Sequence, residues 1–214
     1  MQSHTARVQD IPMRWEESGS GDPVILVHGI PTCPALWRHV APLIQKRRVL
    51  AWEMVGYGSS IPEGRDRDIS VAAQAGYLAA WMEDQGIARA VVAGHDLGGG
   101  VAQILAARHP DKVSGLFLTN AICYESWPVP VVKAVAATGS ILKHAPDGSV
   151  RQFMKLMFSK GHDAAEARAE ALETHAPYYE AHDGAEAFVR QTQSLDNADT
   201  MAVAEDLPRL GIPA

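Results

Sequence analysis

The 214-residue chain is 47% hydrophobic and 21% charged, and its formal net charge is −6 at pH 7. This length fits one domain, or one core with an inserted cap, and the apolar fraction is ample for a buried sheet. The acidic balance argues against nucleic acid or an anionic membrane surface as a partner. No run of about 18 apolar residues is present, so no segment is expected to span a bilayer. Because residues 1–10 also lack the apolar centre of a signal peptide, we expect a cytoplasmic protein.

The first half of the chain alternates strand and helix patterns. Loose alternation around Pro12 predicts an edge hairpin over residues 8–15. Continuous apolar runs predict buried parallel strands over residues 24–28, 49–52, 90–93 and 113–119. Helical spacing predicts helices over residues 34–46, 69–85 and 97–108, the second with Ser70 as N-cap and Gly86 as C-cap. This order predicts an α/β fold with a doubly wound, mostly parallel sheet.

The pattern changes after Asn120, where apolar β-runs end. Helical segments follow over residues 150–158, 164–173 and 185–192. We therefore expect three regions: a core over residues 1–120, an inserted helical cap over residues 121–206, and the start of the remaining core over residues 207–214.

Residues 91–100 read VVAGHDLGGG, in which a β-branched run stops at Gly94 and glycines begin a helix. This is the pattern of a nucleophile elbow, with Asp96 where a hydrolase usually has Ser. The turn is so tight that side chains two positions before and after the nucleophile would clash with backbone, and Gly94 and Gly98 remove that clash. Asp96 is then expected at a helix N-terminus, where the helix dipole favours an anion. The alternative is that Asp96 is an ordinary helix N-cap.

The cysteines and histidines predict no metal or cofactor site. Cys33 and Cys123 are too few for a disulfide framework, so we expect two buried reduced thiols. His175 and His182 lack a spacing such as HExxH or CxxC. The glycines that follow Asp96 are not followed by the Lys of a phosphate-binding loop.

Three motifs, taken together, resemble the α/β-hydrolase fold superfamily. They are HGIPT at residues 28–32, EMVGYGSS at residues 53–60 and GHDLGG at residues 94–99. The first and third together are similar to the branch with an Asp nucleophile, which contains epoxide hydrolases and haloalkane and haloacetate dehalogenases. In that branch a catalytic acid and a His follow the cap. The resemblance therefore implies a C-terminally truncated copy of a protein of roughly 270–300 residues.

The resemblance implies that Asp96 attacks an sp³ carbon of a small apolar substrate. A carboxylate with an ordinary pKa of about 3.9 is ionised at neutral pH, so this step needs no base. The product is an ester of Asp96, which a His-activated water would then hydrolyse. The family pattern places the two backbone N–H donors for the oxyanion on Ile30 and Leu97, and one such donor is worth about 10²–10³ in rate. His28 and His95 are tempting bases, but the family uses them to shape the oxyanion loop and to pack the elbow.

The cap is expected to decide the substrate. Epoxide hydrolases of this branch use two cap tyrosine hydroxyls to protonate the opening ring, and the cap tyrosines here are Tyr124, Tyr178 and Tyr179. Ordinary packing is the alternative for each of them. Trp127 either lines the pocket or is a core aromatic.

Two departures from the haloalkane dehalogenase pattern place epoxide opening slightly ahead of C–halogen cleavage. Such dehalogenases usually have Trp after the nucleophile and often Asn in the HGxP motif, whereas this chain has Leu97 and Ile30. Typical epoxide hydrolases also have that Trp, so its absence is a departure from both patterns. The leading hypothesis is an Asp-nucleophile hydrolase. The alternative is a catalytically incomplete fragment or a non-catalytic binding module. In either case the expected partner is a small molecule, not nucleic acid or a membrane, and a homodimer stays open.

Overall fold

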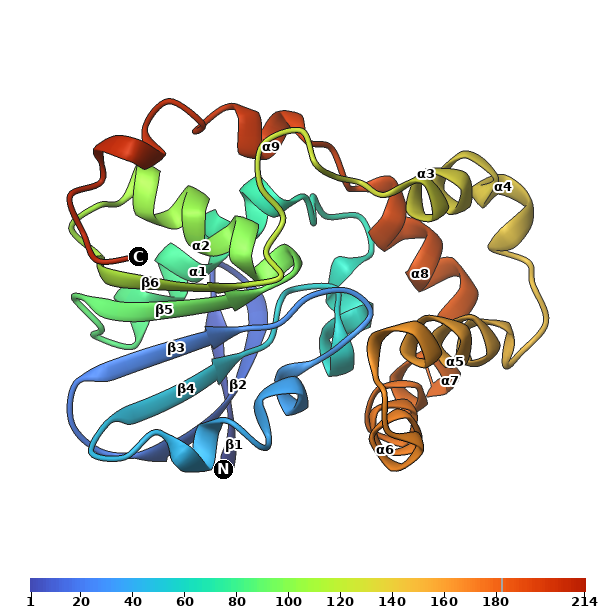
Figure 1. The fold of residues 1–214 in the computed structure, drawn as a ribbon, viewed down its shortest axis with the longest axis horizontal. Helices are drawn as coiled ribbons and strands as arrows, with labels where there is room; N and C mark the ends of the chain where they lie inside the picture. The colour runs from blue at the N-terminus through green and yellow to red at the C-terminus, as the bar shows by residue number, and fades with distance from the viewer. Residues whose placement is uncertain (182) are drawn as a thin grey trace.

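The computed structural model describes residues 1–181 and 183–214, so His182 lies outside the described residues. A six-stranded sheet has the strand order β1-β2-β4-β3-β5-β6 (Figure 1). The strands are β1 (Gln2–Val8), β2 (Ile11–Gly19), β3 (Pro23–Val27), β4 (Arg48–Trp52), β5 (Ala90–His95) and β6 (Val113–Thr119). Strands β3 to β6 are mutually parallel, and the β1–β2 hairpin joins β4 antiparallel. The predicted α/β fold with a mostly parallel sheet is confirmed.

Alternating side chains along the parallel strands serve two separate cores. The elements that cover the sheet are α1 (Val71–Asp84), α2 (Leu97–Arg108), η1 (Pro34–Trp37) and η2 (Ala41–Leu43). In β3, Ile25 and Val27 belong to the larger cluster shared with α1 and α2. Val24 and Leu26 belong to a second cluster, which includes Trp37 of η1. The sheet is thus buried on both faces, as the continuous apolar runs of its parallel strands require.

The helix predicted over residues 34–46 is wrong. The segment forms two short 3₁₀ turns, η1 and η2, rather than one α-helix. Pro42 lies in the middle of the predicted helix, where it has no N–H to donate and its ring would clash with the carbonyl of Arg38. The apolar spacing still works, because Trp37 and Ala41 are buried against the sheet.

The predicted helix over residues 69–85 is confirmed as α1. The Ser70 side chain accepts a hydrogen bond from the backbone N–H of Ala73 and so caps the helix N-terminus. At the other end Gly86 has a φ of +64°, the left-handed conformation in which helices often stop. Helix α2 also follows its predicted span.

Six helices gather beside one end of the sheet, separate from α1 and α2 (Figure 1). They are α3 (Pro130–Ala137), α4 (Gly139–Leu142), α5 (Ser149–Gly161), α6 (Ala165–His175), α7 (Pro177–Ala181) and α8 (Gly184–Gln193). Met154, Phe158 and Phe188 form an apolar cluster among them, and this cluster also contains Ile61 of the core. We call this group of helices the cap. The exact division of the chain at residues 120 and 206 stays a prediction.

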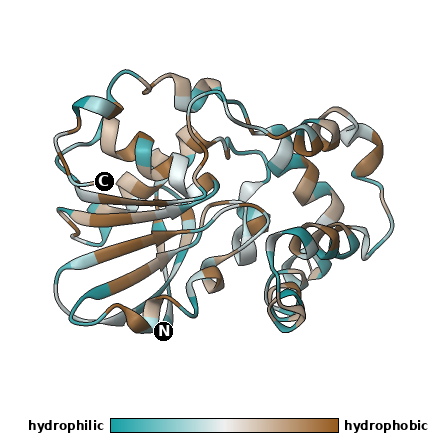
Figure 2. Cartoon of the chain, in the orientation of Figure 1, coloured by the Kyte–Doolittle hydropathy of each residue, from teal (hydrophilic) through white to brown (hydrophobic). Residues whose placement is uncertain are grey.

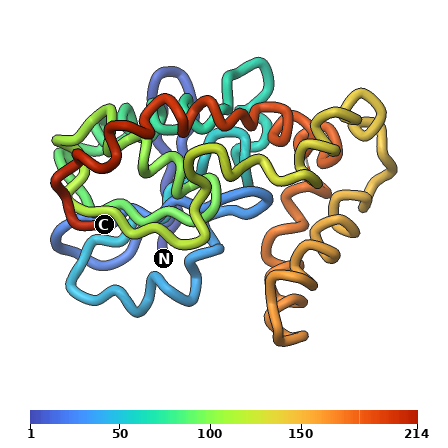
Figure 3. Tube along the Cα trace, turned by 45° about the horizontal axis from the view of Figure 1, so that its top comes forward, coloured from blue at the N-terminus to red at the C-terminus, as the bar shows by residue number. Residues whose placement is uncertain are grey.

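After α8 the chain returns across the core (Figure 3). It passes through α9 (Ala198–Met201) and η4 (Leu207–Arg209). Near the end, the N–H of Leu116 in β6 donates a 2.8 Å hydrogen bond to the carbonyl of Pro213. This contact lies at the outer edge of β6, where Phe117 and Leu118 are exposed.

Hydrophobic residues are concentrated along the central strands, whereas the cap helices mix polar and apolar residues (Figure 2). This distribution matches amphipathic helices that cover each other on one face. Within the described residues, no helix combines the length and apolar character that a membrane span needs.

Candidate active site

Asp96 occupies a strained turn between β5 and α2. Its backbone has φ +54° and ψ −120°, which non-glycine residues rarely adopt. A Cβ on Gly94 would lie 2.2 Å from the carbonyl oxygen of Gly98, and a Cβ on Gly98 would lie 2.2 Å from the carbonyl oxygen of Val27. Both positions therefore exclude a side chain, and this is the steric reason for the two glycines that the sequence pattern identified.

The Asp96 carboxylate points away from its own helix. It makes no capping hydrogen bond to the first turn of α2. Instead Oδ1 accepts a 2.9 Å hydrogen bond from the backbone N–H of Ile30. The helix-capping alternative is therefore wrong. The two amides expected to serve as oxyanion donors, Ile30 and Leu97, lie together at the Asp96 carboxyl group.

The backbone at Gly29 lies close to Asp96 and so brings the N–H of Ile30 to the carboxylate. A Cβ on Gly29 would lie 2.3 Å from Asp96 Oδ1, so only glycine lets the loop lie against the carboxylate. The Gly29 carbonyl accepts hydrogen bonds from both the N–H and the hydroxyl of Thr32. These bonds close the loop over residues 28–32 into a tight turn that presents the Ile30 N–H.

Burial raises the pKa of Asp96 above its ordinary value, because the ionised carboxylate loses hydration. The N–H groups of Ile30 and Leu97 oppose this shift, because they stabilise the negative charge. The site therefore holds a partly dehydrated carboxylate that is oriented by backbone donors. Such a group is a stronger nucleophile than one fully solvated by water.

His28 serves the architecture of the loop. The Met54 N–H donates to its Nε2 over 3.1 Å, which places the ring proton on Nδ1, and Nδ1 donates to the Gly29 carbonyl over 3.0 Å. Burial lowers the pKa of His28 to about 4, so the ring is neutral at neutral pH. Both nitrogens are engaged, which agrees with the structural role expected for this residue.

His95 precedes Asp96 and is half-buried. Burial lowers the pKa of His95, and the neighbouring Asp96 carboxylate partly opposes that shift. Its Nδ1 is buried and has no hydrogen-bond partner among the described residues. His95 is thus a largely neutral ring beside the nucleophile.

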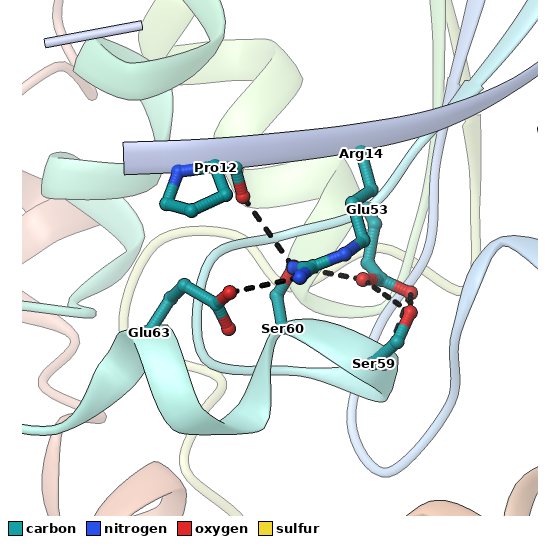
Figure 4. Close-up of polar contacts among 6 residues, drawn as sticks. All are labelled: Pro12, Arg14, Glu53, Ser59, Ser60 and Glu63. Atoms are coloured by element: carbon teal, nitrogen blue, oxygen red, sulfur yellow. Dashed lines mark hydrogen bonds and ion pairs between the residues drawn. The ribbon is translucent and has the colours of Figure 1, made fainter. Parts of the chain in front are cut away.

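A buried polar network supports the loop after β4 (Figure 4). Glu53 accepts hydrogen bonds from the N–H and hydroxyl of Ser59 and from the hydroxyl of Ser60. Arg14 donates to Ser60 and to Glu63, each over 2.9 Å. Burial raises the pKa of Glu53, and the serine donors oppose that shift. Glu53 therefore orders the turn that contains Gly56 and Gly58.

No pattern in the sequence identified Arg14 or Glu63 as part of this network. Arg14 comes from β2 and Glu63 from η3 (Gly58–Gly64), so the two are far apart in sequence. A charged residue in the hairpin predicted over residues 8–15 is ordinarily interpreted as exposed to solvent. Only the pairing of β2 with β4 brings Arg14 beside this turn.

Of the four cap aromatics singled out as substrate contacts, Trp127 lies in the core and Tyr124 lies at the surface. Trp127 is buried, and its indole N–H donates a 2.8 Å hydrogen bond to the Thr200 hydroxyl. Tyr124 is exposed and adopts a positive φ of 47°. Trp127 fills the larger core cluster, which accords with the packing alternative.

Tyr178 and Tyr179 lie under the cap, where their hydroxyls have other partners. The Tyr179 hydroxyl donates to the Gln191 side chain over 2.8 Å, and Gln191 in turn donates to the Gly56 carbonyl. The Tyr178 hydroxyl hydrogen-bonds to the Cys33 thiol. Substrate contact by the four aromatics stays a prediction.

An apolar cavity of about 230 Å³ opens between α3, α4, α5 and α8. Its walls include Val135, Phe153 and Phe188. The same three side chains belong to, or pack against, the cluster that contacts Ile30 of the nucleophile site. In the described parts of the chain, no group of three or more His, Cys, Asp or Glu side chains is arranged to hold a metal ion.

This combination of sheet, elbow and loop matches a known family. Residues 22–148 match the family described as alpha/beta hydrolase fold. The chain belongs to this family. The match includes both the loop over residues 28–32 and the Asp96 elbow, and it extends into the first cap helices.

Relatives within the family differ in what they hydrolyse. The chain is 31% identical over 114 residues to a haloalkane dehalogenase of Agrobacterium fabrum, covering 50% of this chain and 37% of that protein. It is 38% identical over 109 residues to a 2-hydroxymuconate semialdehyde hydrolase of a Pseudomonas species, covering 48% and 37%. The matched region spans little more than a third of either relative's length.

A solved structure of similar fold is that of the epoxide hydrolase CorEH without ligand. It superposes with a TM-score of 0.68 at 21% identity, covering 95% of this chain and 76% of that one. At this identity the similarity establishes the fold.

Proposed function

We propose that the protein is a hydrolase whose Asp96 carboxylate attacks an sp³ carbon of a small apolar molecule. The observation that carries the proposal is the hydrogen bond from the Ile30 N–H to Asp96 Oδ1. It fixes one oxygen of the carboxylate and leaves the other oxygen, Oδ2, for attack. A carboxylate that served only to cap its helix would have no reason to turn toward this loop.

The attack forms a bond between carbon and Oδ2 and breaks the bond from that carbon to its leaving group. The leaving group departs with the electron pair, and Asp96 becomes an alkyl ester. Oδ1 is then the ester carbonyl oxygen. When water adds to the carboxyl carbon of the ester, Cγ of Asp96, negative charge develops on Oδ1. A donor 2.9 Å away is already at the distance that stabilises such an oxyanion.

The leaving group is either a halide or the oxygen of an epoxide. A halide departs as a stable anion, whereas an opening epoxide needs a proton for its oxygen. The Tyr178 and Tyr179 hydroxyls already have other partners, which weighs against their being that acid. The apolar cavity in the cap is lined by neither Asp96 nor Ile30, so it does not favour one leaving group over the other.

Trapping the covalent ester tests the proposal. The purified protein is incubated separately with a small alkyl bromide and a small epoxide, and digested peptides are examined by mass spectrometry. We expect the mass of one alkyl group on Asp96. Asp96→Asn should not be labelled, whereas Glu125→Gln, which removes an exposed carboxylate, should be labelled like the wild type. Labelling at other residues, or labelling that survives Asp96→Asn, refutes the assignment.

The second candidate is a binding module that holds the same molecules without turnover. The observation that favours it is the full engagement of both His28 nitrogens, which leaves this neighbour of the site unable to activate water. The same incubation separates the two functions. A module binds the apolar probe without forming an ester on Asp96.

A further inference from the structure

The cap contacts the nucleophile loop through one buried pair of side chains. Helix α6 of the cap packs against η1, which begins directly after the loop over residues 28–32. At this junction the Cys33 sulfur lies 3.3 Å from Nδ1 of His175, the last residue of α6. Both residues are almost fully buried, at 1% and 2% exposure.

The chemistry of the pair makes it a hydrogen bond between neutral groups. Burial raises the pKa of the Cys33 thiol to about 12 and lowers the pKa of His175 to about 3. The sulfur accepts hydrogen bonds from the Ala35 N–H and the Tyr178 hydroxyl. The thiol and the neutral imidazole therefore share one hydrogen bond, in which either the S–H or the ring N–H is the donor, depending on the His175 tautomer.

The loop between this pair and Asp96 has little freedom. Thr32, the neighbour of Cys33, donates twice to the Gly29 carbonyl, and His28 donates to the same oxygen. A displacement of Cys33 is thus transmitted through a closed turn to the N–H of Ile30. On its other side Ile30 packs against the apolar cluster of the cap.

We propose that Cys33 and His175 are positioning residues, through which the cap holds the Ile30 N–H against Asp96. This inference rests on the proposed function for the role of Asp96. The hydrogen bond between Cys33 and His175 ties α6 to the end of the loop, and the closed turn carries that constraint to the nucleophile. Loss of the bond loosens the Ile30 N–H without removing any atom of the site itself.

A second contact between the same elements provides a matched control. Arg38, just after η1, donates to Glu170 of α6 over 2.6 Å, and His39 also contacts Glu170. These side chains are largely exposed, so the pair contributes little to holding the cap. Glu170→Gln therefore weakens a link between cap and core without touching the buried pair.

Hydrogen exchange of the Ile30 amide is the direct measurement, because it needs no catalysis. We expect Cys33→Ala and His175→Leu to reduce protection of this amide about fivefold to tenfold, the factor that one hydrogen bond supplies. His175→Asn should restore protection, because its Oδ1 offers an acceptor near the place of Nδ1. Glu170→Gln should leave protection unchanged. If His175→Leu does not fold, Cys33→Ala against Cys33→Ser gives the same comparison.

The rate at which an alkyl bromide labels Asp96 provides the second readout. In Cys33→Ala the rate should fall about fivefold to tenfold. Its pH midpoint should also move upward, because a weaker Ile30 hydrogen bond no longer stabilises the carboxylate. A purely structural role would lower stability without moving this midpoint.

The two proposals fail separately. Unchanged Ile30 protection in Cys33→Ala and His175→Leu, or an equal loss in Glu170→Gln, overturns the positioning role whatever the labelling shows. Failure of the wild type to label at Asp96, with Ile30 protection still dependent on Cys33 and His175, overturns the proposed function and leaves the mechanical coupling in place.

Discussion

The backbone N–H of Ile30 donates a 2.9 Å hydrogen bond to Oδ1 of Asp96, across 66 positions of sequence. Two separate loops thus converge on one carboxylate, one at the end of β3 and the other at the end of β5. These strands are hydrogen-bonded neighbours in the parallel sheet, so their carboxyl ends lie side by side. The arrangement agrees with the general rule that open α/β sheets place their sites at the carboxyl ends of strands.

The elbow itself should not tolerate a methyl group. In Gly98→Ala the added Cβ would lie 2.2 Å from the Val27 carbonyl oxygen, and backbone cannot retreat as a flexible side chain can. We expect a loss of about 3 kcal/mol or more in the free energy of unfolding. The matched control is Gly76→Ala. Gly76 is an exposed position of α1, and nothing lies within 4 Å of the new Cβ. That change should stabilise by about 1 kcal/mol.

Urea unfolding of both variants, followed by circular dichroism, checks this prediction. Equal stabilities for Gly98→Ala and Gly76→Ala would contradict the steric account of the elbow.

Local patterns in the sequence were enough to place the elbow and the parallel strands. The glycines around Asp96 act on backbone within a few residues, and such constraints are visible in one stretch of sequence. The segment over residues 34–46 shows the opposite case, since apolar spacing suggested a helix and Pro42 prevented it. Here the proline should have outweighed the spacing.

Contacts between distant segments could not be predicted in this way. Cys33 and His175 are 142 positions apart, and each by itself looks like an ordinary core residue. Their meeting depends on how the cap folds back over η1. The network of Arg14 and Glu63 depends in the same manner on strand order.

Removal of the Asp96 charge should stabilise the fold at neutral pH. The pKa of Asp96 is raised in the folded state by burial, so the folded protein disfavours its ionised form. The stability that protonated Asp96 contributes to the fold is therefore fully present below the ordinary pKa of a carboxyl group. It is lost as the pH rises through the pKa of Asp96 in the folded state. Asp96→Asn keeps an acceptor for Ile30 and should melt about 2–4 °C higher at pH 7, and this advantage should vanish at acid pH.

Thermal melts of the wild type and variant between pH 3 and 8 measure this difference. Asp22→Asn is the control, because its carboxylate is exposed and pairs only with Arg47 at the surface. A lower melting point for Asp96→Asn at pH 7 would show that the ionised Asp96 carboxylate does not destabilise the folded protein.

His175 should produce the opposite pH dependence. Its pKa falls from 6.5 to about 3 in the folded protein. Between these two pH values His175 is therefore protonated in the unfolded chain and neutral in the folded chain. The contribution of neutral His175 to the free energy of unfolding is complete at neutral pH and is lost as the pH falls below 6.5. The stability difference between the wild type and His175→Asn should shrink by up to about 3 kcal/mol between pH 7 and pH 4. Chemical unfolding at a series of pH values measures it, and a constant difference would mean that the pKa of His175 is the same in the folded and unfolded states.

The outer edge of β6 should promote self-association of a polypeptide of residues 1–214. β6 is the last strand in the sheet, and Phe117 and Leu118 on it are 61% and 40% exposed. Apart from the contact at Pro213, this edge offers backbone groups and apolar side chains to another chain. Sedimentation should show dimers or larger species, and Phe117→Lys should shift them toward monomer. The control is Leu43→Lys, an exposed apolar position away from this edge. A wild type that sediments as a monomer at all concentrations contradicts the prediction.

Turnover is expected to stop after one reaction in the same polypeptide. Attack by Asp96 needs only the carboxylate and its Ile30 donor, whereas hydrolysis of the ester needs a base to activate water. His28 cannot supply that base, because Met54 and Gly29 engage both of its nitrogens. With an alkyl bromide we therefore expect at most one equivalent of bromide per protein and a stable ester in the intact mass. Repeated release of bromide by purified protein would reveal a base within these residues. His95, whose Nδ1 has no partner among the described residues, would then be the first candidate, and loss of turnover but not of labelling in His95→Gln would identify it.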